Sequence, residues 1–258
     1  MTTKRTAHER FPEVIAAAVR VFARDGYRTA HMSDVAREAG LSEAALYRYV
    51  DGKESLFVLA IRHALLLEPL PGEDDPAGEF PLKAPPLTQM IREAREFVAA
   101  EVPFGALAAA LRSGPGNPDD LDDPAGELQL VMRELFTLEE QTARAADMIE
   151  RSARELPELA DLLNTGLRRP VLDALTQYLD SRAKTGKLRT TPDTAATARL
   201  ILETLTWFAR HRHSDPYGAA IPPALAQETA VDALLHALVP PRYLEERDAP
   251  ERDLGERR

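Results

Sequence analysis

The sequence predicts an all-α protein with two domains. Apolar residues recur at helical spacing through most of the 258 residues, Ala and Leu dominate the periodic stretches, and alternating strand-like runs are absent. A cluster of prolines interrupts the helical pattern near residue 68. We therefore expect an N-terminal helical domain over 1–67, a Pro-rich linker over 68–86, a larger helical domain over 87–244 and a charged, disordered tail over 245–258.

The composition excludes several classes of protein. Hydrophobic residues make up 44% of the chain, which is enough for a buried core. The chain has no cysteine, so it has neither disulfides nor thiolate metal sites nor a cysteine nucleophile. No run of about 18 apolar residues could span a bilayer, and residues 1–13 are polar and charged, unlike a signal peptide. We expect a cytoplasmic protein with no membrane partner.

The charge is distributed unevenly along the chain. The net charge of −10 argues against nucleic acid at first sight, because Lys and Arg lead phosphate binding. Residues 1–67, however, hold ten Lys and Arg against eight Asp and Glu, so the rest of the chain holds 22 against 34. A mildly basic head on an acidic body permits a nucleic-acid partner without requiring one.

The first helix is predicted from one apolar face and two punctuating residues. Gly26 should stop the helix, since glycine ends helices readily. Its start is open to two interpretations: a capping box over 6–9, or a start at Pro12 as the first helical residue. We prefer the second, because a start near residue 6 would place Pro12 inside the helix. The apolar face consists of Val14, Ile15, Ala18, Val19 and Phe22.

Three more helices are predicted before the linker. Ser33 and Ser42 are expected to be the N-caps of two short helices. Asp51, with Glu54 three residues later, is expected to cap a fourth helix that runs through Leu67.

The larger domain should contain six helical segments. Pro170 should kink one of them near Gly166, and the Gly, Pro and Asp-rich segment 113–126 should be a loop. The helices are expected at 87–101, 104–112, 127–154, 157–185, 193–212 and 224–238.

The segment 33–49 has the pattern of a helix-turn-helix. That motif requires a small residue where two helices cross, a left-handed residue in the turn and apolar residues that lock the pair. Ala36 supplies the small contact, and Gly40 lies four residues later, in the turn. The inward positions around them are Val35, Ala39, Leu41, Leu46 and Tyr49.

The second helix of this motif, from about Glu43 to Tyr49, leaves a face free for DNA. Ser42, at its positive N-terminal end, can bind a phosphate through its hydroxyl and backbone amide. An alternative is a helical hairpin that binds nothing, since such hairpins use the same small and apolar residues. The residues that would face a major groove are Glu43, Ala44, Ala45 and Arg48.

The stretch FARDGYRTAHMSDVAREAGLSEAALYRYVDGKESLF, residues 22–57, resembles the DNA-binding signature of the TetR family of transcriptional regulators. The resemblance covers about the first sixty-five residues. It implies that residues 42–48 read bases, whereas packing of Tyr47 and Tyr49 in the core is the alternative for the two aromatics. The residues that it implies as phosphate contacts are Thr29, Ser33, Tyr47, Tyr49 and Lys53.

The sequence departs from the family's common pattern at a few positions, which leaves the operator sequence open. The methyls of Ala44 and Ala45 can only touch a thymine methyl or leave room, whereas Arg48 can reach guanine and Glu43 can accept from cytosine. The departures are Ala30, Ala44, Ala45 and Tyr49, where Thr, Gly, Thr and His are frequent.

The body resembles the same family more loosely, and there the family uses two late helices per subunit to form a four-helix dimer interface. Two late helices of this chain each have an apolar face that suits this role. The alternative is that both faces pack inside one subunit. The residues of the two faces are Ala198, Ile201, Leu202, Leu205 and Ala209, then Leu225, Val231, Leu234, Leu235 and Leu238.

Bulky apolar side chains in the body are consistent with a pocket for an apolar effector. Plain core packing is the alternative for each of them. The candidates for lining such a pocket are Phe97, Phe104, Met132, Phe136, Tyr178 and Trp207.

The resemblance thus implies a ligand-responsive repressor that binds near-palindromic double-stranded operator DNA as a homodimer and is released by a small apolar or amphipathic effector. We expect no enzyme activity, no cofactor and no metal. Two alternatives stay open: an activator of the same family, and a helical ligand-binding protein or enzyme with a vestigial head.

Overall fold

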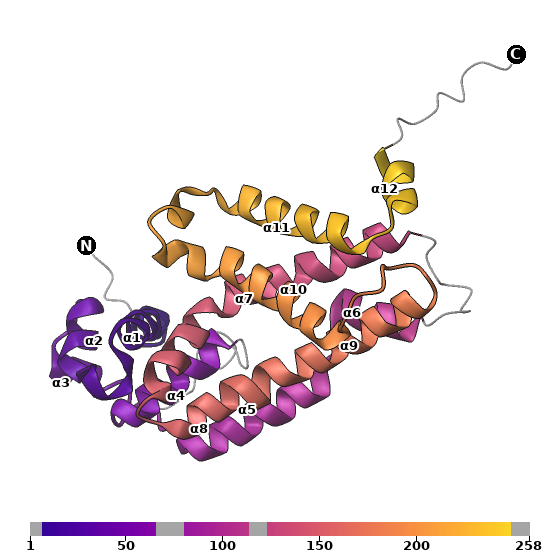
Figure 1. Cartoon of the computed structure of the whole chain (residues 1–258). Coiled ribbons are helices and arrows are strands. Elements are labelled where there is room, and N and C mark those ends of the chain that lie inside the picture. The colour runs from indigo at the N-terminus through magenta and orange to yellow at the C-terminus, as the bar shows by residue number, and fades with distance from the viewer. Residues whose placement is uncertain (1–6, 66–79, 114–122, 249–258) are drawn as a thin grey trace, which may run out of the picture. The chain divides into compact units, whose positions relative to one another are not determined.

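The computed structural model describes residues 7–65, 80–113 and 123–248. Every regular element in these ranges is a helix, which confirms the all-α prediction (Figure 1). One isolated bridge between Val50 and Leu82 is the only strand-like pairing in this part of the chain. None of the described helices combines the length and the apolar character needed to cross a membrane.

The chain packs as two units. The first unit holds residues 1–101 and 141–170, and the second holds 102–140 and 171–258, so the division falls within one long helix. The first unit therefore combines the predicted head, residues 1–67, with segments of the predicted larger domain. The end of the N-terminal domain at residue 67 and the start of the larger domain at residue 87 stay predictions.

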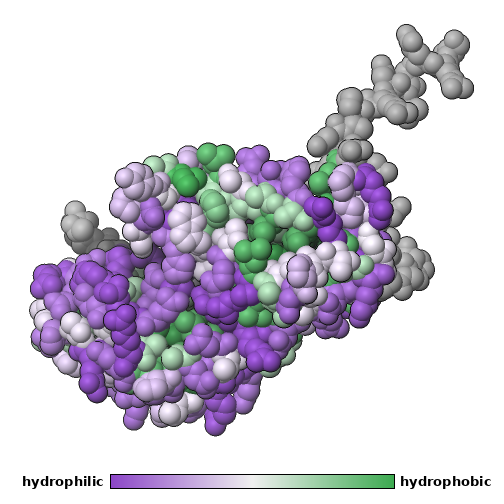
Figure 2. Space-filling view, in the orientation of Figure 1, coloured by the Kyte–Doolittle hydropathy of each residue, from purple (hydrophilic) through white to green (hydrophobic). Residues whose placement is uncertain are grey.

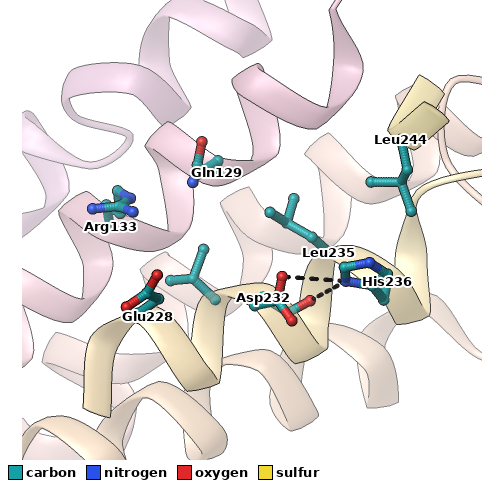
Figure 3. Close-up of a pocket in the computed structure, with 8 residues that line it drawn as sticks. Gln129, Arg133, Glu228, Asp232, Leu235, His236 and Leu244 are labelled. Atoms are coloured by element: carbon teal, nitrogen blue, oxygen red, sulfur yellow. Dashed lines mark hydrogen bonds and ion pairs between the residues drawn. The ribbon is translucent and has the colours of Figure 1, made fainter. Parts of the chain in front are cut away.

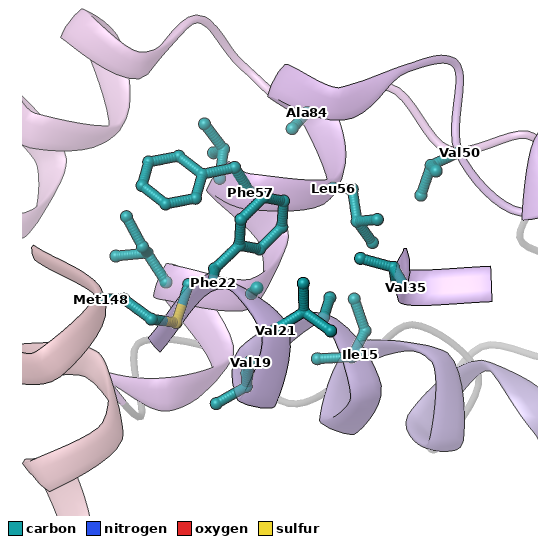
Figure 4. Packing of buried hydrophobic residues seen from close by; sticks show 14 of the residues in the cluster. Ile15, Val19, Val21, Phe22, Val35, Val50, Leu56, Phe57, Ala84 and Met148 are labelled. Carbon is teal, nitrogen blue, oxygen red and sulfur yellow. The ribbon is translucent and has the colours of Figure 1, made fainter. Parts of the chain in front are cut away.

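The first unit is built from helices of the head and of the body sequence. They are α1 (Ala7–Thr29), α2 (Met32–Glu38), α3 (Glu43–Leu46), α4 (Lys53–Ala64), α5 (Leu87–Glu101), the last part of α7 (Pro124–Ala153), α8 (Pro157–Asp161) and the π-helix η1 (Leu162–Arg168). Its core is apolar and aromatic (Figure 4). The rings of Phe22 and Phe57 meet edge to face with centroids 5.0 Å apart, and Met148 of α7 joins the same cluster. The predicted apolar face of α1 is buried in this core.

The start of α1 corrects our expectation, because the helix begins at Ala7 and contains Pro12. A proline near the beginning of a helix removes few hydrogen bonds, since the first turn's N–H groups have no intrahelical acceptor and only the next turn is affected. The predicted stop is confirmed: Gly26 has φ 76° and ψ 175°, which interrupts the helix.

One of three predicted caps is confirmed. Ser42 precedes α3, and its hydroxyl oxygen accepts the Ala45 N–H at 3.2 Å. Ser33 is not a cap, because α2 already starts at Met32 and His31 takes the cap position. Gly52, rather than Asp51, precedes α4.

The helix departs from regular α-helical geometry where the kink near Gly166 was predicted. The segment Leu162–Arg168, which contains Gly166, is a π-helix between α8 and α9 (Arg169–Lys184). Proline has no N–H for the carbonyl four residues earlier, so the regular hydrogen-bond ladder cannot continue through this point.

The second unit contains the remaining helices. They are α6 (Gly105–Arg112), the first part of α7, α9, α10 (Thr194–Ala209), the short 3₁₀ helices η2 (His211–Ser214) and η3 (Gly218–Ala220), α11 (Pro223–Leu238) and α12 (Pro241–Asp248). Helix α12 extends four residues into the segment expected to be disordered, and the rest of that segment lies outside the described residues.

A buried ion pair ties three helices of this second unit together. The Arg182 guanidinium of α9 donates from Nε and Nη2 to the two carboxylate oxygens of Glu127 on α7, at 2.7 and 2.8 Å. Nη2 also donates to the Ala110 carbonyl of α6 at 2.6 Å. Two parallel hydrogen bonds of this kind are the strongest form of a carboxylate contact, so this pair sets the relative positions of the three helices.

The apolar faces of α10 and α11 are buried within the single chain. All residues predicted for the dimer interface lie in the core of the second unit except Leu225, which is 51% exposed. For these residues the alternative of packing inside one subunit is therefore correct. Other apolar side chains, Leu200 and Trp207, remain exposed on α10, and hydrophobic surface gathers over α10 and α11 (Figure 2).

Candidate nucleic-acid interface

The turn between α2 and α3 has the geometry that a helix-turn-helix requires. Gly40 has φ 65°, in the left-handed region. The Leu41 N–H donates to the Ala36 carbonyl at 2.8 Å, and the Gly40 N–H donates to the Arg37 carbonyl at 3.1 Å. These two bonds form the Schellman motif, which ends α2 sharply and redirects the chain into α3.

Apolar side chains lock α2 and α3 together as the sequence predicts. Val35, Ala36 and Leu46 are fully or almost fully buried in the core of the first unit. Ala36 carries the small side chain at the crossing, and Ala39 and Leu41 pack partly against the same core. The motif therefore packs on α1 and shares one apolar core with α1 and α4.

Helix α3 ends at Leu46, earlier than the predicted end at about Tyr49, so the helix and its flanking residues together present the side chains predicted to meet bases. Ser42, Glu43, Ala44 and Arg48 are exposed, and Ala45 is half-buried. Because the Ser42 hydroxyl oxygen already accepts the Ala45 N–H, its proton stays available for a phosphate oxygen. One carboxylate, one guanidinium and two methyls then make up the surface that a groove would meet.

The two tyrosines of this region have different environments. Tyr47 is exposed and can reach a partner. Tyr49 is only 6% exposed, and its ring packs against Phe11 and Phe80 with centroids 6.5 and 5.6 Å away. This corrects the assignment of Tyr49 to the exposed phosphate-binding set, because its aromatic ring serves the core as the alternative interpretation has it.

The other predicted phosphate contacts lie at the ends of helices. Thr29 is the last residue of α1, and Ser33 lies in the first turn of α2; both are exposed. The positive end of α2 adds a partial charge near Ser33.

Lys53, the first residue of α4, is positioned by three neighbours. Its ammonium donates to the Arg28 carbonyl at 3.1 Å and lies 4.8 Å from the centre of the Tyr27 ring. Partial burial lowers the pKa of Lys53, and the nearby Glu155 carboxylate opposes that effect. An ammonium has three donors, so Lys53 keeps hydrogen-bonding capacity for a phosphate.

The turn that follows Gly26 is held by residues from a distant part of the chain. The Tyr27 N–H donates to the hydroxyl of buried Ser152 at 3.0 Å, and the Arg28 N–H donates to the Glu155 carboxylate at 3.0 Å. Both acceptors lie at the end of α7 or just after it. Sequence reasoning assigns them no role, since a pairing across more than 120 residues leaves no local pattern.

Comparison with known proteins decides which family this head belongs to. Residues 14–60 match the family model described as "Bacterial regulatory proteins, tetR family". The N-terminal part of this chain belongs to the TetR family. The HTH-type transcriptional regulator HbdR of Aromatoleum sp. (strain CIB) is 31% identical over 65 residues, which span 25% of this chain and 28% of that relative. The likeness to HbdR therefore concerns the head alone.

The TetR-type head continues into a body whose fold is also found in solved structures. The ketosteroid transcriptional regulator KstR2 of Mycobacterium tuberculosis matches with a TM-score of 0.53 at 16% identity, covering 92% of this chain and 97% of that one. SmeT of Stenotrophomonas maltophilia, in its triclosan complex, matches with a TM-score of 0.51 at 16% identity over 91% and 94% of the two chains. At this identity the likeness establishes the fold.

The six side chains predicted to line an effector pocket are spread through the body of the chain. Phe97 lies in the first packing unit and is 44% exposed, whereas the other five belong to the second unit. Three of these five are buried in its core, Phe104 is half-buried and Trp207 is exposed beside Phe208. The three buried ones are Met132, Phe136 and Tyr178.

A separate surface pocket of about 170 Å³ lies between α7, α11 and α12 (Figure 3). Arg133 of α7 lines it together with Glu228 and Asp232 of α11, and His236 contacts Asp232 within the same helix. These walls are polar and charged, so the pocket does not match the apolar effector that the sequence predicts. Within the described residues, no group of three metal-binding side chains is found.

Proposed function

We propose that this chain is a ligand-responsive transcriptional repressor that binds operator DNA through its TetR-type head. The observation that carries the proposal is the exposed face of α3, which the Schellman turn and the Ser42 cap present rigidly on the head. A rigid polar helix face at the end of a small domain suits the major groove.

The proposed division of labour separates base contacts from phosphate contacts. Arg48 and Glu43 read bases, and Ser42, Thr29, Ser33, Tyr47 and Lys53 bind phosphates. A base contact should change which sequence is preferred, whereas a phosphate contact should weaken every sequence alike and reduce the dependence of affinity on salt.

This proposal is tested with a duplex that the wild-type protein selects from a random-sequence library. Fluorescence anisotropy at several salt concentrations would compare the selected duplex with a random one. We expect Arg48→Ala to relax the selected sequence, and Lys53→Ala to weaken both duplexes and lower the salt slope by about one unit. Arg92→Ala, in an exposed ion pair on α5, is the matched control for a lost cation. A wild-type protein that selects no sequence would contradict the proposal.

The proposed repressor acts as a homodimer through the outer faces of α10 and α11. Leu200 is 61% exposed, Trp207 38% and Leu225 51%, and they lie on α10 and α11, two helices that pack against each other. Hydrophobic surface gathers over these two helices (Figure 2). Clustered apolar surface of this kind supports an interface with a second copy. A dimer also supplies two recognition helices for two half-sites about one DNA turn apart.

Sedimentation velocity tests the dimer. We expect wild-type dimers at micromolar concentration, and monomers for the double variant Leu200→Glu, Leu225→Glu. Leu130→Glu places the same charge on an exposed apolar position of α7 and should leave the dimer intact. Monomeric wild type with full operator affinity would refute the two-half-site arrangement.

The proposed effector is a small apolar or amphipathic molecule that binds in the second unit. Met132, Phe136 and Tyr178 are buried apolar side chains of that unit's core, and Phe104 and Trp207 stay predicted contacts. Phe97 belongs to the first unit and is left out of this proposed site. The SmeT structure holds triclosan, and KstR2 is described as a ketosteroid regulator; these are properties of those two proteins that fit the same class of ligand.

Effector and operator should oppose each other reciprocally, with a coupling of about 1–3 kcal/mol. Trp207 is the only tryptophan, so its fluorescence offers a direct readout for a panel of apolar compounds. Titration of a hit with and without the selected duplex measures the coupling. Equal affinity in both titrations would exclude release by that effector.

A further inference from the structure

A short extended segment within the predicted linker is hydrogen-bonded to the chain that leaves the recognition motif, which consists of α3 and the turn after it through Arg48. This segment, Phe80–Ala84, forms a strap. It lies outside residues 14–60, the part that matches the TetR family model. Leu82 donates its N–H to the Tyr49 carbonyl at 2.8 Å and accepts the Asp51 N–H at 3.1 Å. The strap therefore pairs with the turn between α3 and α4 on both sides of Val50.

Side chains at both ends of the strap extend this attachment. The Phe80 ring lies 5.4 Å from the Phe11 ring, 5.6 Å from Tyr49 and 4.8 Å from His8, between centroids. At the other end the Ala84 N–H donates to the Ser55 hydroxyl at 3.2 Å, and Ala84 is buried in the head core (Figure 4).

The strap supplies contacts that the recognition motif cannot make by itself. Helix α3 is only four residues long, and the chain between it and α4 runs through turns. The Tyr49 carbonyl and the Asp51 N–H have no helical partner there, so their hydrogen bonds come from Leu82. The exposed side chains of Tyr47 and Arg48 directly precede this attached turn. The N-terminal end of the recognition motif is held by the Gly40 turn, and its C-terminal end is held by the strap.

We propose that the strap is a positioning element for sequence readout: it holds the C-terminal end of the recognition motif in the orientation in which Arg48 reaches a base. The proposal rests on the proposed DNA-binding function and assigns part of its specificity to residues beyond the conventional head. Phe80 is the principal positioning residue, because its ring joins the strap to both α1 and Tyr49.

A positioning role and a merely stabilising role make different predictions. A displaced recognition motif loses base contacts but keeps most phosphate contacts, so the ratio of selected-duplex affinity to random-duplex affinity falls. A smaller folded fraction lowers both affinities equally and leaves their ratio unchanged. The ratio is therefore the decisive quantity.

The test compares full-length wild type with Phe80→Ala, using the selected duplex and a random-sequence duplex of the same length. If the docked strap falls to about a tenth of the molecules, we expect the affinity ratio to fall about tenfold. Phe80→Leu keeps an apolar side chain and should show a smaller change in the same direction, so it serves if Phe80→Ala folds poorly. Lys83→Ala changes an exposed strap residue and should leave the ratio unchanged.

Hydrogen exchange supplies a readout that is independent of DNA. The Asp51 amide should exchange faster in Phe80→Ala, because its acceptor on Leu82 is released. An unchanged affinity ratio in both Phe80 variants, for a wild type that does select a sequence, overturns the strap proposal alone. A wild type that selects no sequence contradicts the proposed function and the strap proposal together.

Discussion

The head and the α10–α11 hairpin differ in how well their functional faces follow from periodicity. In the head, the residues predicted to point inward, such as Val35 and Leu46, are buried, and Ser42 and Arg48 point outward. In the hairpin, the apolar residues predicted for an interface are all buried in their own subunit except Leu225, and Leu200, which was not predicted, is exposed. A periodic apolar stripe shows that a helix face is buried, but it does not show which chain buries it.

The two regions differ in this way because their helices carry different numbers of apolar faces. Each short helix of the motif has one apolar face, and the left-handed Gly40 turn permits one way of crossing. Helix α10 carries apolar residues on its inner side and also at Leu200 and Trp207. A helix with two apolar faces has two possible partners, and only packing selects between them.

The largest expected effect tests which face of α10 belongs to the core. Leu205 is fully buried, so Leu205→Ala should lower the free energy of unfolding by about 2–5 kcal/mol. Leu200→Ala should change the stability of the subunit by no more than about 0.5 kcal/mol. Denaturant unfolding at a protein concentration low enough for monomers measures both losses, because a dimer would add its own association energy. Similar losses for the two variants would remove the distinction between the faces.

A second experiment tests the single crossing geometry of the head. Gly40→Ala should lower the free energy of unfolding by about 1–2 kcal/mol, because a side chain disfavours the left-handed conformation. A methyl group would meet no described atom within 4 Å at Gly40 or at Gly52, and Gly52 has an extended φ of 170°. Gly52→Ala is thus a control for the added methyl alone, and an equal loss there would contradict the backbone argument.

A smaller effect distinguishes the confirmed cap from the rejected one. Ser42→Ala should cost about 1 kcal/mol, since the Ala45 N–H loses its acceptor. Ser33→Ala should be close to neutral, because Ser33 lies inside α2 and is exposed. Thermal unfolding of the two variants side by side checks this, and a larger loss for Ser33→Ala would restore it as a cap.

The smallest expected effect is a pH dependence of stability that arises from Tyr178, in the core of the second unit, and that is absent at neutral pH. Burial raises the pKa of Tyr178 well above its ordinary value of about 10. Below about pH 10 the Tyr178 phenol is neutral in both the folded and the unfolded state. Above it, the unfolded state releases a proton that the folded state retains, so the free energy of unfolding falls as pH rises.

Tyr178→Phe should therefore reduce the fall in the free energy of unfolding between about pH 9 and about pH 11. Tyr217→Phe, at a position that is 89% exposed, should leave the pH dependence unchanged. Denaturant unfolding across this range measures both variants. The same alkaline slope in Tyr178→Phe as in the wild type would contradict the assignment.

The parts of the interface that sequence reasoning missed share one property. The Ser152 hydroxyl and the Glu155 carboxylate hold backbone N–H groups of the turn after Gly26, and the Leu82 backbone holds backbone groups of the turn after α3, so each contact binds a backbone group. Any residue has a backbone, so such partners have no compositional signal. The Ser152 hydroxyl is recognisable only once α7 lies beside the end of α1.

The sequence by itself determined the helical class, the position of the helix-turn-helix and the break near Pro170, because helical periodicity, glycine turns and proline act over a few residues. Tertiary structure decided between the inward and the phosphate-binding interpretations of Tyr49, attached Phe80–Ala84 to the head, and determined which faces of α10 and α11 stay exposed. These outcomes depend on which distant surfaces meet. Burial depends on all neighbours at once, so no local pattern can specify it.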